Sequence, residues 1–218
     1  MYQDDPDPTL GPLHARNLMQ RSSKLIADFA ACGGRSSDLD SIYCRRSLRE
    51  LVRACTGLPE LYLSGCPYNA AYYNAYGVGD GLGWHFDRSA FGVCIVLQSP
   101  GAGGQFDFHS GTRAATAAGN TSENSQYRLV EAIIKGDERK SVVTVQGVQP
   151  GSLVMFAGRN SLHRVSTVTA GPDRINAILT YEERPDQRPG AYTLAKFFGR
   201  GSDGSRITAP GQARPGAD

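Results

Sequence analysis

Apolar residues in the first quarter of the chain recur with the spacing of an α-helix. Between residues 39 and 55 they repeat every three or four positions, and Gly57 follows where such a helix would end. These apolar positions are Leu39, Ile42, Leu48, Leu51, Val52 and Cys55. The period predicts a helix with one apolar face against a core. Gly33 and Gly34 separate it from an earlier predicted helix that contains Leu25, Ile26 and Phe29.

Between residues 61 and 183 the pattern changes to short apolar runs separated by turns rich in Gly, Pro and Asn. Runs at residues 91–98, 149–156, 161–169 and 174–181 have the length and composition of strands. One insert, residues 127–136, has helical spacing and ends in glycine. The pattern predicts a mainly β protein with bracing helices (α+β) and an antiparallel sandwich or barrel.

A chain of 218 residues is long enough to bury a sizeable core within one domain. Within that domain we expect N-terminal helices over residues 1–60 that pack on a β core over residues 61–198. Residues 199–218 are rich in Gly, Pro, Ser and charged residues, and this composition predicts a flexible C-terminal tail.

Residues 84–87 read Trp-His-Phe-Asp and follow a glycine-rich turn. Side chains two apart in an extended segment project to the same side, so His85 and Asp87 can bind one metal ion while Phe86 points away. His163, on a distant predicted strand, is the candidate third ligand. Two imidazoles and one carboxylate hold a redox-active iron on one face and leave its other face open.

Arg174 begins the predicted strand after the one that carries His163, so it could reach the same pocket. A fixed guanidinium beside an open metal site suits an organic acid. Such an acid would chelate the metal with one end and pair its far carboxylate with the arginine.

From about residue 72 to residue 181 the chain resembles the Fe(II)/2-oxoglutarate-dependent oxygenases, with their motifs in the same order. Trp-His-Phe-Asp at 84–87, Gly-Gly-Gln-Phe at 103–106, Leu-His-Arg-Val at 162–165 and Phe-Phe-Gly-Arg at 197–200 are also similar to a narrower group. This is a small bacterial branch of free-amino-acid hydroxylases, ring-forming oxidases and radical halogenases. The resemblance implies a double-stranded β-helix, also called a jelly roll, with helices bracing one sheet.

The same resemblance implies the cofactor chemistry. Fe(II) would be bound by His85, Asp87 and His163, with 2-oxoglutarate as co-substrate and O2 as oxidant. Arg174 would neutralise the far carboxylate of 2-oxoglutarate, and Asn74 and Tyr76 would contact the same molecule; strand packing is the alternative role for Tyr76. The substrate would be a free amino acid or similar small molecule, and hydroxylation, desaturation and cyclisation all remain open.

Four further residues are candidates for the pocket. Trp84 precedes a ligand and either lines the substrate site or packs in the core. Arg88 and Arg113 each could meet a substrate carboxylate, although a solvated charge is the ordinary role of a surface arginine. His109 lies on a predicted strand, and we expect it to face solvent or form a hydrogen bond rather than bind the metal.

The net charge of +2, without a basic run, gives no indication of a nucleic-acid or membrane partner. No apolar stretch approaches the roughly 20 residues that span a bilayer. The acidic N-terminus differs from a signal peptide, and five cysteines without a Cys-x-x-Cys pair predict reduced thiols in the cytoplasm. Two alternatives stay open: an oxygenase of the same superfamily that acts on nucleic acid or protein, and a non-enzymatic jelly-roll binding protein.

Overall fold

Two five-stranded antiparallel sheets form the core of the chain in a computed structural model that describes residues 7–113 and 123–207. The first, here called the β5 sheet, has the order β1 (Ser22–Ser23), β5 (Gly81–His85), β11 (Leu162–Val165), β8 (Phe106–His109) and β9 (Val143–Thr144). The second, the β6 sheet, has the order β10 (Leu153–Phe156), β6 (Gly92–Gln98), β13 (Arg174–Leu179), β4 (Ala71–Tyr76) and β2 (Leu25–Ala27).

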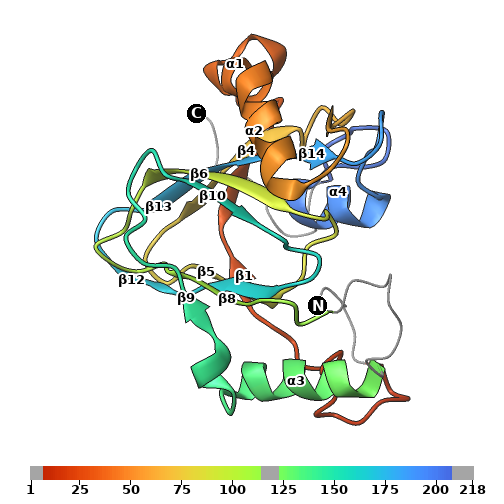
Figure 1. The fold of residues 1–218 in the computed structure, drawn as a ribbon, viewed down its shortest axis with the longest axis vertical. Helices are drawn as coiled ribbons and strands as arrows, with labels where there is room; N and C mark the ends of the chain where they lie inside the picture. Colours follow the sequence, from red (N-terminus) through yellow and green to blue (C-terminus); the bar gives the residue numbers. More distant parts are fainter. Residues whose placement is uncertain (1–6, 114–122, 208–218) are drawn as a thin grey trace, which may run out of the picture.

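The two sheets lie one above the other in Figure 1. Two small ribbons complete the strands: β12 (Val168–Ala170) pairs with β7 (Ala102–Gly103), and β14 (Tyr181–Glu182) pairs with β3 (Tyr62–Leu63). This arrangement confirms the predicted mainly β, jelly-roll core.

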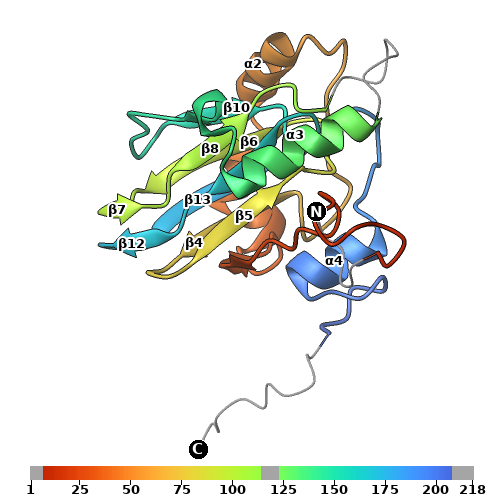
Figure 2. The same cartoon turned by 90° about the horizontal axis from the view of Figure 1, so that it is seen from below.

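Helices cover the outer faces of both sheets (Figures 1 and 2). Helices α1 (Asp38–Tyr43) and α2 (Arg46–Thr56) pack on the β6 sheet, where Leu39, Tyr43 and Val52 join one buried cluster with Val93 and Leu179. Helix α3 (Glu123–Lys135) packs on the outer face of the β5 sheet, where its Val130 and Ile133 are buried against Trp84 and Leu162. Helix α4 (Ala191–Phe198) lies at one end of the core. The predicted helical insert over residues 127–136 is therefore confirmed.

The N-terminal helical prediction is right in one part and wrong in another. The long helix is divided at Cys44 and Arg45, and its predicted end is confirmed: Gly57 has φ 69° and its N–H donates to the carbonyl of Arg53. The earlier helix is absent, because Leu25–Ala27 form strand β2, which pairs with β4. Hydrogen bonding to an existing sheet edge outweighs the local preference of this short apolar run.

The segment from β1 to β2 crosses between the sheets, because β1 pairs with β5 and β2 pairs with β4. Residues before 60 therefore supply an edge strand to each sheet as well as the two helices. Directly after β2, Asp28 accepts two hydrogen bonds from Arg200, at 2.9 and 2.6 Å, and these bonds hold the end of this crossing segment.

Arg200 belongs to the segment predicted as a flexible tail, but residues 200–207 contact the core through this ion pair and through Tyr68. The tail prediction from residue 199 is therefore wrong for this part, and residues 208–218 lie outside the described residues. Among the described helices, none has the length and apolar character needed to cross a bilayer.

Candidate active site

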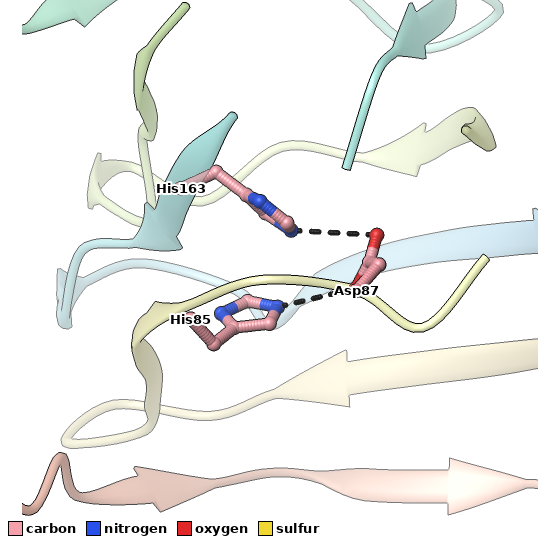
Figure 3. A group of neighbouring side chains, drawn as sticks. All are labelled: His85, Asp87 and His163. Carbon is pink, nitrogen blue, oxygen red and sulfur yellow. Dashed lines mark ion pairs between the residues drawn. The ribbon is translucent and has the colours of Figure 1, made fainter. Parts of the chain in front are cut away.

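Three metal-ligand side chains meet between the two sheets. The register pairs His163 of β11 directly with His85 of β5, and the two ring centroids are 4.1 Å apart. Asp87 follows two residues after the end of β5, and its backbone N–H donates to the carbonyl of Gly158 at 3.0 Å. Figure 3 shows its carboxylate between the two rings: Oδ1 is 3.6 Å from His85 Nε2 and Oδ2 is 3.5 Å from His163 Nε2.

Backbone carbonyls orient both imidazoles. Nδ1 of His85 lies 2.8 Å from the carbonyl of Gly83, and Nδ1 of His163 lies 2.9 Å from the carbonyl of Ser161. A carbonyl only accepts, so each Nδ1 carries the proton and each Nε2 presents a lone pair toward Asp87. Both rings are thus fixed in the tautomer that a divalent metal requires.

The electrostatics of the cluster suit a divalent cation. Burial lowers the pKa of His85, so its imidazole stays neutral. Asp87 supplies the negative charge of the cluster and faces the Nε2 atoms of both rings. The ligand atoms of the three residues lie within 4.8 Å of one another. Two neutral nitrogens and one carboxylate fit Fe(II) and leave positions for other ligands.

The cluster opens into a cavity of about 360 Å³ between the sheets. His85, Asp87 and His163 line it together with Arg174, the first residue of β13. The Arg174 side chain is only 9% exposed; its Nη1 donates to Asn176 Oδ1 at 2.8 Å, and its Cζ lies 5.4 Å from the centre of the Tyr76 ring. The predicted guanidinium therefore lies in the same cavity as the metal-ligand cluster.

Asn74 and Tyr76 also line this cavity, as the sequence predicts for residues two apart on one strand. Their strand β4 pairs with β13, which places Tyr76 opposite Arg174 and Asn74 opposite Asn176. Oδ1 of Asn74 is buried and has no hydrogen-bond partner among the described residues. A buried acceptor of this kind needs a hydrogen-bond donor, and a bound molecule that carries an N–H or O–H group could supply one.

A sequence model of the Halogenase D family matches residues 30–194. The chain belongs to the Halogenase D family. The matched region contains all three candidate ligands and Arg174, and it includes every strand of the core except β1 and β2. A comparison with curated protein sequences gives no match.

Solved structures support the fold assigned to this Halogenase D family member. The α-ketoglutarate-dependent non-haem epimerase SnoN from nogalamycin biosynthesis shares 16% identity over 92% of this chain and 86% of its own, with a TM-score of 0.54. This likeness shows a common fold. The resemblance to the Fe(II)/2-oxoglutarate oxygenases predicted from the sequence is thereby confirmed.

Two shorter matches are a 2OG-Fe(II) oxygenase from Burkholderia pseudomallei and HygX from Streptomyces hygroscopicus. The first shares 15% identity over 68% of this chain, with a TM-score of 0.47, and the second shares 13% over 66%, with a TM-score of 0.44. The family member described here spans 57% of the length of the Burkholderia oxygenase and 64% of HygX.

Two predicted substrate residues lie elsewhere in this family member. Trp84 is buried in the cluster under α3 and is not among the residues that line the cavity, because strand alternation points it to the face opposite His85. Arg113 is likewise outside the cavity lining, and its Cζ lies 3.9 Å from the centre of the Phe86 ring. Trp84 thus has the core position, one of its two expected roles, and Arg113 is not brought to the cavity, whereas Arg88 does line it.

His109 is hydrogen-bonded rather than part of the metal cluster, as expected. Its Nδ1 lies 3.1 Å from Thr112 Oγ1, and the cluster found among the described residues contains only His85, Asp87 and His163.

Sequence reasoning missed Lys24 and Thr193, which both line the cavity. Lys24 lies between β1 and β2, and Thr193 lies in the first turn of α4, where its buried Oγ1 has no partner among the described residues. Neither residue stands in a recognisable motif, so its position in the cavity follows only from the three-dimensional fold.

Proposed function

We propose that this protein is an Fe(II)/2-oxoglutarate-dependent dioxygenase that oxidises an unactivated C–H bond of a small molecule, with O2 as the oxidant. The observation that carries this proposal is that the His85–Asp87–His163 cluster and Arg174 line one cavity. A structural metal site would instead close its coordination sphere with protein ligands. A buried arginine beside an open site gives the far end of a dicarboxylate a partner.

His85, Asp87 and His163 would hold the iron, and Arg174 would pair with the distal carboxylate of 2-oxoglutarate. Asn74 and Tyr76 line the same cavity and would contact the same co-substrate. When bound, Fe(II) with 2-oxoglutarate and O2 supplies an oxidant for C–H bonds, and succinate and CO2 are the by-products. The chain itself contributes position: it holds the reacting C–H bond close to the metal and excludes water.

The substrate proposed is a free amino acid or a similar small molecule of secondary metabolism. Arg88 supports this proposal: it lines the cavity, and its Cζ lies 5.4 Å from the centre of the Tyr192 ring in α4. Thr193, the next residue, has an unpartnered buried hydroxyl in the described structure. A substrate carboxylate beside Arg88 would satisfy both the charge and the hydroxyl.

Asp87 determines which oxidation we propose. Halogenating relatives carry a small residue in place of this carboxylate, which opens a metal position for halide. Here the carboxylate is present, and its charge disfavours a second anion at the same position. We therefore propose hydroxylation, desaturation or cyclisation rather than halogenation, although the family is named for a halogenase.

The cysteines support a cytoplasmic location. All five are free thiols in the structure: Cys32, Cys44, Cys55, Cys66 and Cys94. Unpaired cysteines are typical of proteins in reducing compartments.

The test is a succinate-release assay with Fe(II), 2-oxoglutarate and a library of free amino acids, together with mass spectrometry of the products. We expect succinate to form in step with an oxidised amino acid. Parallel reactions with nucleotides and peptides provide the comparison. Turnover of those alone would reassign the substrate class, and an absence of any 2-oxoglutarate consumption would contradict the proposed chemistry.

A further inference from the structure

Lys24 enters the cavity from the segment that connects the two sheets. It follows β1, which pairs with β5, and precedes β2, which pairs with β4. Its side chain lines the cavity with the metal-ligand cluster and Arg174. The family match begins at residue 30, so this lysine lies outside the region shared with the family.

The strand register places Lys24 in one row with Tyr76 and Arg174. Leu25 pairs with Ala75, and continuing that register by one residue brings Lys24 beside Tyr76. On the other side of β4, Tyr76 pairs with Arg174. Residues in one row of a sheet project to the same face, and neighbouring strands are about 4.8 Å apart.

The side-chain contacts agree with this row. Nζ of Lys24 lies 5.8 Å from the centre of the Tyr76 ring, and Cζ of Arg174 lies 5.4 Å from the same point. One aromatic ring therefore has a cation from each neighbouring strand beside it. Both cationic side chains also line the same cavity.

The protein supplies no anion to these two cations. Within residues 7–113 and 123–207, the Lys24 ammonium makes no hydrogen bond or ion pair. Asp87, which the metal requires, is the one carboxylate among the described residues that line the cavity. Burial raises the pKa of both Tyr76 and Cys94, so these neighbours stay neutral.

Leaving two like charges together in a cavity is costly unless a ligand of opposite charge joins them. The cost is visible at Lys24, where burial and the nearby Arg174 lower the ammonium pKa to about 8, although Asp87 raises it. The ligand must therefore be an anion, and it must lie at the Tyr76 row, on the side of the cavity where Arg174 is found.

We propose that Lys24 is a second cationic anchor for the distal carboxylate of 2-oxoglutarate, acting together with Arg174. The identity of this anion rests on the proposed function. Arg174 provides the planar fork that sets the orientation of the carboxylate, and Lys24 adds a point charge from the opposite side of Tyr76. Lys24 thereby favours 2-oxo acids with a second carboxylate over those that lack one.

The test compares two ligands in wild type, Lys24→Met and Lys24→Arg. Anaerobic calorimetry with Mn(II) bound at the metal site would measure the Kd of 2-oxoglutarate and of 2-oxobutyrate, which has no distal carboxylate. We expect Lys24→Met to raise the Kd of 2-oxoglutarate about 10- to 100-fold, the range for losing a charge-assisted contact. The Kd values of 2-oxobutyrate and Mn(II) should not change, and Lys24→Arg should restore most of the 2-oxoglutarate affinity.

Lys140→Met is the matched control, because Lys140 is exposed and not among the residues that line the cavity. Unchanged 2-oxoglutarate affinity in Lys24→Met would overturn the assignment. Equal losses for both oxo acids would also overturn it, since they would indicate a general disturbance of the cavity. If only substrate affinity falls, Lys24 belongs to the substrate site instead. Failure of the wild type itself to bind 2-oxoglutarate would contradict the proposed function, which is a separate result.

Discussion

Gly158 leaves the space that the Asp87 carboxylate occupies. A Cβ added at residue 158 would lie 2.7 Å from Cγ of Asp87 and closer still to its Oδ2, which is tighter than atoms can approach. The same two residues are joined through the backbone, because the N–H of Asp87 donates to the carbonyl of Gly158. The Asp87 carboxylate can therefore take its position only because residue 158, on another segment, is a glycine without a Cβ.

Gly158→Ala should therefore displace Asp87 and weaken metal binding. We expect the Kd of Mn(II), measured by calorimetry, to rise by about tenfold or more, because a displaced ligand loses its orientation. Gly11→Ala is the matched control, since a Cβ at residue 11 meets no atom within 4 Å. Wild-type metal affinity in Gly158→Ala would show that Asp87 can move without leaving the site.

Removing either imidazole should abolish the metal site. His85→Ala and His163→Ala each leave two ligands, which cannot hold an exchangeable divalent ion against water. We expect Fe(II) affinity to fall at least about 100-fold, with loss of the visible band that a 2-oxo acid chelated to iron gives. His109→Ala, which removes only the contact with Thr112, should retain both properties. Wild-type affinity in either ligand variant would show that the ligand assignment is wrong.

Arg174 should determine affinity for 2-oxoglutarate and not for the metal. Arg174→Ala removes a hydrogen-bonding charge, and the expected loss is about 1.5–3 kcal/mol of 2-oxoglutarate binding free energy. Arg174→Lys should lose less, because it keeps the charge without the two-pronged geometry. Calorimetry with 2-oxoglutarate and with Mn(II) separates the two effects. Arg113→Ala serves as the comparison, since that arginine packs on Phe86 outside the cavity lining.

The wild type should not chlorinate its substrate, even in concentrated chloride. In the proposed site Asp87 would occupy the metal position that a halide needs, and its negative charge would disfavour a second anion there. Mass spectrometry of reactions with and without chloride checks this expectation. A chlorinated product would contradict the role given to Asp87.

Affinity for 2-oxoglutarate should fall as pH rises above about 8. The pKa of Lys24 is about 8 without a ligand, and its charged neighbours in the cavity are Arg174 and Asp87, beside the neutral groups of Tyr76 and Cys94. A bound dianion favours protonated Lys24, so binding takes up a proton above this pH, and Kd should rise toward about tenfold per pH unit. Calorimetry between pH 7 and 9.5 would show this slope in the wild type, whereas Lys24→Met should show none.

The part of the site that the sequence predicts best is the part set by local geometry. His85 and Asp87 lie two apart beside a glycine-rich turn, and this spacing is enough to expect a shared metal. The end of α2 at Gly57 is equally local, because a residue with φ 69° favours glycine.

The errors arise where distant contacts decide the structure. Leu25 and Ile26 have apolar side chains compatible with a helix, but the free edge of β4 pairs with them and makes a strand. Strand alternation in β5 points Trp84 away from His85, but the helix α3 that covers it there comes from a distant part of the chain. The roles of Lys24 and Gly158 depend on partners more than 50 residues away, so no local pattern could reveal them.

The ion pair between Asp28 and Arg200 ties together two walls of the cavity that come from opposite ends of the chain. Asp28 follows the segment that carries Lys24, and Arg200 follows α4, which carries Thr193. Both charged side chains are well shielded, with 8% and 12% exposure, so loss of one partner would leave the other buried and uncompensated. The residues proposed for co-substrate and for substrate binding therefore depend on one shared ion pair, and a truncation before residue 200 should impair both kinds of binding.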